Sequence, residues 1–326
     1  MAHDIGKLVM IGFDGTESTP ELRSFIKDEG IGGIILFRRN IVSQAQTKRL
    51  VERLKDEVDG DLLVAIDQEG GRVQRLPDSF GIFPSMAEVA KMAIERDDAG
   101  AAYEAGERIA HALRPIGVGW DFAPVLDVST NPFNPIIGDR AFSEDPDFVG
   151  ELAVQFMKGL MEGGIVACGK HFPGHGDTDI DSHVELPTLP HTRKRFEVCE
   201  WKPFRTAIKA GLPSIMTGHL MAPHLDPELP ASISPTITTD ILRGELGFKG
   251  VIVTDDLVMA GIADYMLVSE AAVASIAAGA DMIIISQDPA KQRESLDALK
   301  KATDNSTLPA NRLSESRTRL SKMKSL

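Results

Sequence analysis

The stretch Gly164-Ile165-Val166-Ala167-Cys168 is a short apolar run that leads directly into a polar segment, Lys170 to His183. An apolar run of this length is typical of a parallel strand that is buried on both faces. The polar segment holds three histidines, one lysine and three aspartates within fourteen residues, and its Gly, Pro and Asp content breaks regular structure. A solvated loop explains the aspartates, but it gives no reason for Lys-His directly after a strand. We therefore expect a buried strand that ends in an active-site loop.

The same pattern recurs along the chain: an apolar run, a polar or glycine-rich exit, and a stretch with helical periodicity. The apolar runs predict eight strands, at 8–11, 33–37, 62–66, 118–122, 165–168, 214–217, 251–254 and 282–285. Helical periodicity covers 44–58, 86–113, 146–162, 195–210 and 269–278. Eight strand–helix units predict an α/β fold with a single (β/α)8 barrel of the TIM type. A doubly wound open sheet is the alternative, although no Gly-x-Gly-x-x-Gly turn follows the first run.

Length and composition narrow the class of protein. The chain has 326 residues, of which 43% are hydrophobic and 25% charged, and no Pro/Ser-rich linker divides it. We expect one catalytic domain over residues 1–326, with a polar C-terminal segment from about Lys300. The formal charge of -13 argues against nucleic acid or an anionic membrane as a partner. Because we find no leader segment and no apolar run of membrane length, we expect a cytoplasmic protein. The sequence does not show the oligomeric state, and a monomer is the default expectation.

Polar side chains follow five consecutive predicted strands, at the position where barrel enzymes carry their active sites. These exits hold Asp67, Glu69, Arg72 and Arg75; Asp121 and Asp127; Lys170 and His171; His219; and Asp255 and Asp256. The convergence predicts the site, because a single residue such as His219 suits a structural hydrogen bond equally well. Of Asp255 and Asp256, one should face the barrel axis as a nucleophile while the other caps the next helix. Periodicity does not say which.

Four segments of the chain carry a family resemblance. They are 67–75 (DQEGGRVQR), 137–142 (IGDRAF), 170–183 (KHFPGHGDTDIDSH) and 254–259 (TDDLVM). Together and in this order they resemble the β-N-acetylhexosaminidases of glycoside hydrolase family 3, over about residues 6–290. The resemblance implies a retaining exo-glycosidase, without a metal or other cofactor, that removes a terminal non-reducing N-acetylglucosamine. It implies a small glycoside or muropeptide as the substrate, since bacterial members usually serve peptidoglycan recycling.

The resemblance also implies a role for each matching residue. Asp255 matches the nucleophile that forms a covalent glycosyl-enzyme, His183 the general acid and base, and Asp181 its orienting partner. The residues that match sugar-binding positions are Asp67, Arg75, Arg140, Lys170 and His171. Most retaining glycosidases use a second carboxylate in place of His183. An imidazole can do the same work, since its unperturbed pKa of about 6.5 lies close to neutral pH, and Asp181 can fix its tautomer.

Other functions remain open from the residues themselves. The segment from His171 to His183 holds ligand types that suit Zn²⁺ or Mn²⁺, which would make a metal-dependent hydrolase, although a glycine-rich loop lacks the fixed spacing of a helix-borne site. A non-catalytic sugar-binding protein can use the same fold. A glycoside phosphorylase is a closer alternative, because a histidine acid/base repels phosphate less than a carboxylate does. A β-glucosidase is a further alternative. No motif marks the residues that recognise the leaving group.

Overall fold

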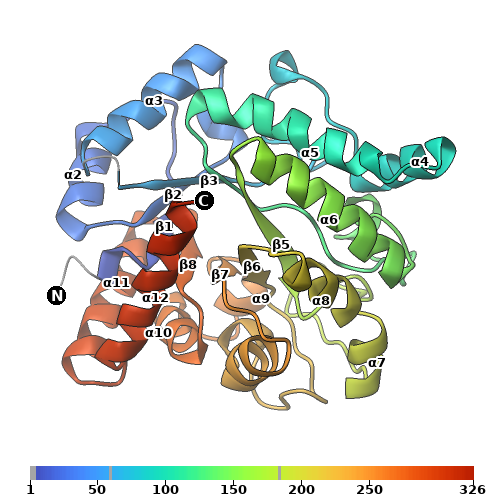
Figure 1. Cartoon of the computed structure of the whole chain (residues 1–326). Helices are drawn as coiled ribbons and strands as arrows, with labels where there is room; N and C mark the ends of the chain where they lie inside the picture. Colours follow the sequence, from blue (N-terminus) through green and yellow to red (C-terminus); the bar gives the residue numbers. More distant parts are fainter. Residues whose placement is uncertain (1–4, 59–60, 183–184) are drawn as a thin grey trace.

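The computed structural model describes residues 5–58, 61–182 and 185–326. Within these residues, eight parallel strands pair in chain order and close into a barrel, β1 next to β8 (Figure 1). The strands are β1 (Val9–Ile11), β2 (Gly33–Leu36), β3 (Leu63–Ile66), β4 (Trp120–Asp121), β5 (Val166–Phe172), β6 (Ser214–Thr217), β7 (Val251–Asp256) and β8 (Met282–Ile285). The predicted TIM-type barrel is thus confirmed, and the open sheet is wrong.

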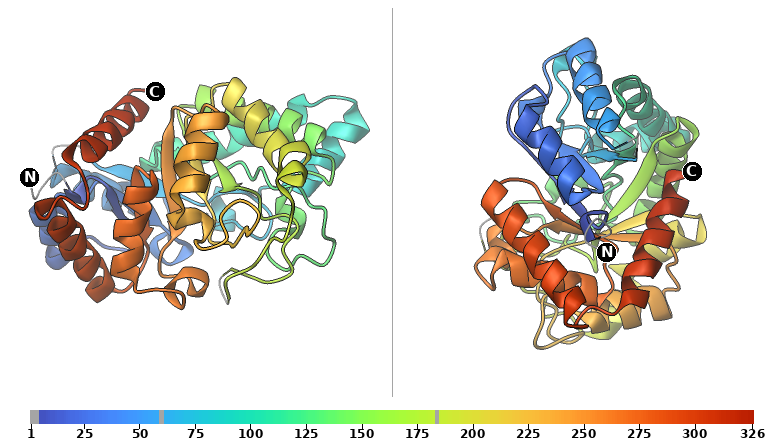
Figure 2. Two further views of the ribbon diagram at one scale, coloured as in Figure 1. Left: turned by 90° about the horizontal axis from the view of Figure 1, so that it is seen from below. Right: turned by 90° about the vertical axis from the view of Figure 1, so that its left-hand side faces the viewer.

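Helices surround the strands in both side views of the molecule (Figure 2). The α-helices are α2 (Pro20–Glu29), α3 (Gln44–Asp56), α4 (Met86–Arg96), α5 (Gly100–Leu113), α6 (Pro146–Glu162), α7 (Arg193–Val198), α8 (Trp201–Lys209), α9 (Ala260–Ala263), α10 (Val268–Ala278), α11 (Pro289–Asp304) and α12 (Ala310–Lys324). Shorter elements are the 3-10 helices η1 (Arg38–Asn40), η2 (Asp78–Phe80), η3 (Arg114–Ile116), η4 (Gly138–Arg140) and η5 (Ala231–Ile233), and the π-helix η6 (Thr236–Glu245). Among the described helices, none is long and apolar enough to cross a bilayer.

Two predicted helices are each divided in the structure. The helix predicted over 86–113 ends at Asp97, which adopts a left-handed conformation with φ 52° and closes α4 before α5 begins. Asp tolerates this conformation better than most residues because its side chain is short and polar. The helix predicted over 195–210 becomes α7 and α8, separated at Cys199 and Glu200. By contrast, α6 has the predicted bounds, and Asp145 caps its first turn.

Strand β5 is longer than its apolar run. We predicted a strand over 165–168 with Lys170 and His171 beyond its end, but both residues lie inside β5. Hydrogen bonds to both neighbours extend the strand, because Leu126 N donates to Lys170 O at 2.6 Å and Gly218 N donates to Phe172 O at 2.9 Å. Lys170 and His171 therefore have positions fixed by the sheet, and the loop begins only after Phe172.

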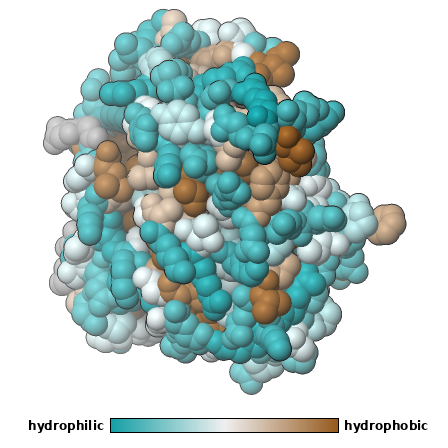
Figure 3. Space-filling model, turned by 45° about the vertical axis from the view of Figure 1, so that its right-hand side comes forward, coloured by the Kyte–Doolittle hydropathy of each residue, from teal (hydrophilic) through white to brown (hydrophobic). Residues whose placement is uncertain are grey.

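The C-terminal face of the barrel interior is closed by apolar side chains. Ile35 of β2, Met216 of β6 and Ile284 of β8 border one cavity there, together with Phe122 directly after β4. Interior layers of this kind, built from alternate strands, are a general feature of TIM barrels. The outer surface is different: the face in Figure 3 is mostly hydrophilic, with hydrophobic side chains in small separate groups. The polar residues that follow the strands therefore lie above an apolar floor formed by these four side chains.

Candidate active site

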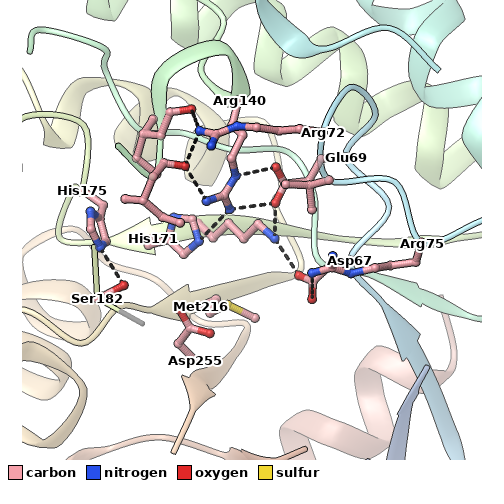
Figure 4. Close-up of a pocket in the computed structure, with 14 residues that line it drawn as sticks. Asp67, Glu69, Arg72, Arg75, Arg140, His171, His175, Ser182, Met216 and Asp255 are labelled. Carbon is pink, nitrogen blue, oxygen red and sulfur yellow. Dashed lines mark hydrogen bonds and ion pairs between the residues drawn. The ribbon is translucent and has the colours of Figure 1, made fainter. Parts of the chain in front are cut away.

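Side chains from β3 to β7 and the loops after them line a cavity of about 250 Å³ at the C-terminal end of the barrel (Figure 4). The cavity is somewhat smaller than typical ligand pockets, which hold about 300–1,000 Å³. Its lining consists of Asp67, Glu69, Arg72, Val73, Arg75, Ile136, Ile137, Arg140, Lys170, His171, His175, Ser182, Met216 and Asp255. The predicted sugar-binding residues are all in this set, and so is the predicted nucleophile.

A buried network of ions forms one wall of the cavity. Lys170 Nζ lies 2.6 Å from Glu69 Oε1 and 2.7 Å from Asp67 Oδ1. Arg140 binds the Glu69 carboxylate with two nitrogens, at 2.8 and 2.9 Å. The side chain of Glu69 is 1% exposed and that of Lys170 is 2% exposed. Buried charges of this kind are tolerated only when they are paired.

The network fixes the charge of its members at neutral pH. Burial alone would raise the pKa of Glu69, but the charges of Arg140 and Lys170 outweigh it and hold this pKa well below its ordinary value. Burial would likewise lower the pKa of Lys170, yet Asp67 and Glu69 raise it above the ordinary value. The cavity therefore offers a permanent ammonium donor next to carboxylate acceptors, which suits a ligand covered with hydroxyl groups.

Asp127 orients His171. Its Oδ2 lies 2.7 Å from His171 Nδ1, while its Oδ1 accepts hydrogen bonds from the backbone N–H groups of His171 and His175. On the other side of the ring, His171 Nε2 lies 3.3 Å from Arg140 Nη2. Because a guanidinium can only donate, we assign the proton to Nδ1, and Nε2 is then the acceptor. Asp127 thus holds the imidazole in one tautomer and one orientation.

The adjacent aspartates of β7 have different surroundings. Asp255 lines the cavity, and its Oδ1 accepts a hydrogen bond from the backbone N–H of Asp256 at 2.8 Å. Asp256 instead accepts hydrogen bonds from the hydroxyl and the backbone N–H of Ser286 and from Val258 N–H. Burial raises the pKa of Asp256 to about 6. Of the two carboxylates that periodicity could not distinguish, Asp255 is the one that lines this cavity.

The segment predicted to carry the acid/base dyad reaches the cavity at Ser182. His175 Nε2 lies 3.1 Å from Ser182 Oγ, and His175 Nδ1 lies 2.8 Å from Thr178 Oγ1, so a buried imidazole anchors this part of the loop. Asp181 precedes Ser182, and its carbonyl accepts a hydrogen bond from Glu185 N–H at 3.1 Å. His183, the predicted general acid and base, lies outside the described residues.

Two of the polar residues predicted at strand ends lie in the core and not beside the cavity. His219 is buried between Ser232 Oγ, at 2.8 Å, and the carbonyl of Asp256, at 3.0 Å, which is the structural role that we considered. Asp121 is also buried, and its Oδ1 accepts a hydrogen bond from Gln68 N–H at 2.9 Å. Neither residue is among the described side chains that line the cavity of about 250 Å³.

Sequence reasoning gave no role to several residues of the site. Glu69 is the central counter-ion of the network, yet the sequence identified it only as one of the polar residues after the third predicted strand. Its spacing was a usable signal, because residues two apart in extended backbone face the same side and Asp67 was already a candidate. Arg72 is a second case, since its guanidinium donates to Asp139 and to the carbonyls of Ile136 and Ile137 and so connects the β3 loop with the β4 loop.

Comparison with known proteins decides the family. The model of the glycosyl hydrolase family 3 N terminal domain matches residues 1–323. The chain belongs to glycosyl hydrolase family 3. The resemblance seen in the four sequence segments is thereby confirmed, and the protein is a glycoside hydrolase. Within the described residues of this family member, no group of three or more His, Cys, Asp or Glu is arranged to hold a metal ion.

Relatives of this family 3 chain are similar over most of their length. The β-hexosaminidase of Idiomarina loihiensis is 38% identical over 296 residues, which are 91% of this chain and 88% of the relative. The β-hexosaminidase of Nitrosospira multiformis is 40% identical over 283 residues, 86% of this chain and 80% of the relative.

Solved structures of the family share the architecture. A family 3 β-N-acetylglucosaminidase from Paenibacillus sp. has a TM-score of 0.96 and 40% identity; the match covers all of this chain but only 62% of the Paenibacillus chain. NagZ from Neisseria gonorrhoeae, in complex with N-trifluoroacetyl-D-glucosamine, has a TM-score of 0.79 and 30% identity, and covers 97% of this chain and 98% of its own.

Proposed function

We propose that the protein is a retaining exo-β-N-acetylhexosaminidase, which removes a terminal N-acetylglucosamine from the non-reducing end of a glycoside. The observation that carries the proposal is that Asp255 shares one small cavity with the paired ions Lys170 and Asp67. A cavity of about 250 Å³ suits a single sugar unit and therefore exo-action. The relatives named β-hexosaminidase, and the NagZ complex with an N-acylated glucosamine, support this sugar as the ligand.

In this proposal the ion network binds the hydroxyl groups of the terminal sugar. Asp67 accepts hydrogen bonds from sugar hydroxyls, and a charged acceptor makes these bonds stronger than neutral ones. Lys170 and Arg140 donate, and Glu69 keeps both cations in place. Because the cations and carboxylates of the network hold one another in place within the fold, the sugar meets an arrangement that needs little further ordering, which favours binding.

Asp255 would attack the anomeric carbon while His183 donates a proton to the leaving oxygen, so that the glycosidic bond breaks and a glycosyl-enzyme forms. In the second step His183 would take a proton from water, whose oxygen attacks the same carbon and releases Asp255. Asp181 would orient the imidazole and stabilise its protonated form. The described neighbour of His183, Ser182, borders the cavity, which supports a role for this loop next to the substrate.

The natural substrate would be a muropeptide or another fragment of peptidoglycan, processed in the cytoplasm during cell-wall recycling. The support for this part of the proposal is the family resemblance of the four sequence segments. Each of the two competing activities differs from the proposed one in a single reactant group. A β-glucosidase needs no acetamido group on the sugar, and a phosphorylase uses phosphate in place of water. Both differences can be tested directly with purified protein.

The test is to incubate the protein with a chromogenic β-N-acetylglucosaminide and the corresponding β-glucoside, in phosphate-free buffer that contains a chelator. We expect release from the first substrate only, loss of at least about 10³-fold in Asp255→Ala, and normal activity in Asp240→Ala, an exposed control. An NMR time course should show the β-anomer as the first product. Equal release from both glycosides, a requirement for metal, or sugar 1-phosphate formed on addition of phosphate would contradict the proposal.

A further inference from the structure

Five polar side chains form a closed network beside the segment that follows β5. Thr130 Oγ1 donates a hydrogen bond to Asp177 Oδ1 at 2.8 Å, and Arg195 Nη2 donates to Thr130 Oγ1 at 3.0 Å. Arg195 Nε donates to Glu200 Oε1 at 2.9 Å. His191 Nε2 completes the circle, because it lies 2.8 Å from Asp177 Oδ2 and 4.0 Å from Glu200 Oε1. These five side chains, the Asp177 network, join the segment after β4, the segment after β5 and the region of α7.

The Asp177 network lies apart from the proposed sugar site. The described lining of the catalytic cavity includes none of its five side chains, so a direct contact with the terminal sugar does not explain them. They are also largely shielded from water: the side chain of Glu200 is 3% exposed, that of His191 18% and that of Asp177 23%. Charges in such surroundings are screened less than surface charges. The network therefore holds Asp177 in one position.

The backbone on both sides of Asp177 is held to the same segment after β4. Asn134 Nδ2 donates a hydrogen bond to the carbonyl of Gly176 at 3.1 Å. On the other side, Asn131 Nδ2 donates to the carbonyl of Thr178, also at 3.1 Å. Two asparagines thus hold the carbonyls before and after Asp177, while the Asp177 network holds the side chain between them.

The segment continues from Asp177 to a second fixed point at Ser182. Ser182 Oγ lies 3.1 Å from His175 Nε2, and the carbonyl of Ser182 accepts a hydrogen bond from Gly261 N–H at 3.0 Å. His183, the proposed acid and base, is the next residue in the sequence. Only four residues separate Asp177 from Ser182. Because so short a piece of chain has little reach of its own, a displacement at Asp177 is transmitted towards His183.

We propose that Asp177 is a positioning residue for proton transfer: the Asp177 network fixes the start of the segment that presents His183 to the leaving oxygen. The inference rests on the proposed function, because it concerns the proton that His183 gives to this oxygen while Asp255 attacks. A displacement of about 1 Å that originates far from the reacting atoms can lower a rate about 10²-fold. Loss of the network therefore slows protonation of the leaving group and leaves binding of the sugar unchanged.

The dependence of the rate on the leaving group separates this role from a merely structural one. Phenyl β-N-acetylglucosaminide needs a proton on its leaving oxygen, whereas the 2,4-dinitrophenyl glycoside releases a stable anion without one. In Asp177→Ala, the ratio of kcat/KM for the phenyl substrate to kcat/KM for the dinitrophenyl substrate should fall at least about tenfold. The inhibition constant of free N-acetylglucosamine should stay within about twofold. Asp179→Ala, at an exposed aspartate of the same segment, is the matched control and should leave the ratio unchanged.

A second pair of variants tests the same network should Asp177→Ala not fold. Thr130→Val removes the hydroxyl between Asp177 and Arg195 and should lower the ratio about two- to fivefold. Thr130→Ser keeps the hydroxyl and should have the wild-type ratio. An unchanged ratio in Asp177→Ala, or in Thr130→Val when the first variant does not fold, overturns the inference alone. An equal loss on both substrates also overturns it, because such a loss is structural.

Two further results would remove the proposed function as well. His183→Ala gives the ratio for complete loss of the proton donor, and this ratio should be at least as low as that of Asp177→Ala. If His183→Ala does not lower the ratio, His183 is not the acid and Asp177 has nothing to position. A wild type that is inactive on both substrates overturns the proposed function and the inference together.

Discussion

Glu69 and Lys170 form an ion pair of 2.6 Å in which both side chains are almost completely buried. Lys170 comes from the interior of β5 and Glu69 from the loop after β3, so the pair joins two strands that are separated by β4. Arg140 adds a second cation to the same carboxylate from the β4 loop. The charges that would bind a sugar are therefore also the charges that hold the loops after β3 and β4 against strand β5.

Removal of the shared carboxylate should destabilise the protein. Glu69→Gln leaves Lys170 and Arg140 buried with one fewer counter-charge, and breaking a buried pair in this way costs about 3–5 kcal/mol. Urea unfolding at pH 7 measures the change. The control is Glu104→Gln, which breaks an exposed 2.9 Å pair with Arg96 and should cost less than about 1 kcal/mol. Equal effects of the two variants would mean that the Glu69 pairs contribute little net stability.

Protonation of His175 should lower stability in mildly acidic solution. Burial, with a smaller contribution from His171, lowers the pKa of His175 to about 4 from 6.5. The unfolded chain binds this proton more readily than the folded protein does. The contribution of neutral His175 to the unfolding free energy is therefore complete above pH 6.5, and about 3 kcal/mol of it is lost in total as the pH falls towards 4. Unfolding free energies at pH 7.5 and 4.5 should differ less in His175→Gln than in the wild type. His111→Gln, an exposed control, should behave like the wild type.

Much of the barrel could be predicted from the sequence, because parallel strands covered on both faces are continuous apolar runs. The bounds of β6 and β8 agree with their runs. The extension of β5 was not predictable in the same way. Lys170 is a charged residue within a strand, and what makes its burial tolerable is a pair of carboxylates about a hundred residues earlier in the chain.

The sequence predicted that the polar residues after five strands would gather at one site, but it did not predict which of these residues would pair with one another. Alternation along β7 predicts that Asp255 and Asp256 face different sides, but which of them faces the cavity could not be predicted, and the pairing of β7 with β8 has a register irregularity between Val253 and Asp256. Strict alternation cannot anticipate such an irregularity. Asp127 was likewise predicted only as a polar residue after a strand, since its bond to His171 joins the segment after β4 to strand β5. Long-range pairing, and not residue type, gives these side chains their roles.

Phe37 should tune sugar binding through Arg75. Two guanidinium groups lie over its ring, with distances to the ring centroid of 4.6 Å for Arg39 Cζ and 5.7 Å for Arg75 Cζ. Within the described part of the chain, Arg75 forms an ion pair with Asp67 at 3.7 Å, so the ring is a main support for its orientation. Loss of a cation–π contact is worth about 0.5–1 kcal/mol at such a site, and Phe37→Leu should weaken inhibition by N-acetylglucosamine about two- to fivefold. Phe133→Leu, at a ring 87% exposed, is the control and should change nothing.

At the opposite end of the barrel, Asp281 should be essential for stability but not for the chemistry. It is fully buried directly before β8, and its carboxylate meets Arg243 at 2.5 Å, Arg319 at 3.0 Å and Arg312 at 3.1 Å. Arg312 and Arg319 belong to α12, so this carboxylate attaches the last helix to the barrel.

Asp281→Ala should therefore cost about 3–5 kcal/mol of unfolding free energy, because it leaves three guanidinium groups without their shared counter-charge. The matched control is Glu315→Gln, whose carboxylate is 54% exposed and pairs with two of the same arginines; it should change stability by less than about 1 kcal/mol. At a temperature where Asp281→Ala is still folded, its kcat/KM should equal that of the wild type, since the catalytic cavity opens at the other end of the strands. A loss of activity without a loss of stability would show that the N-terminal end of the barrel is coupled to Asp255.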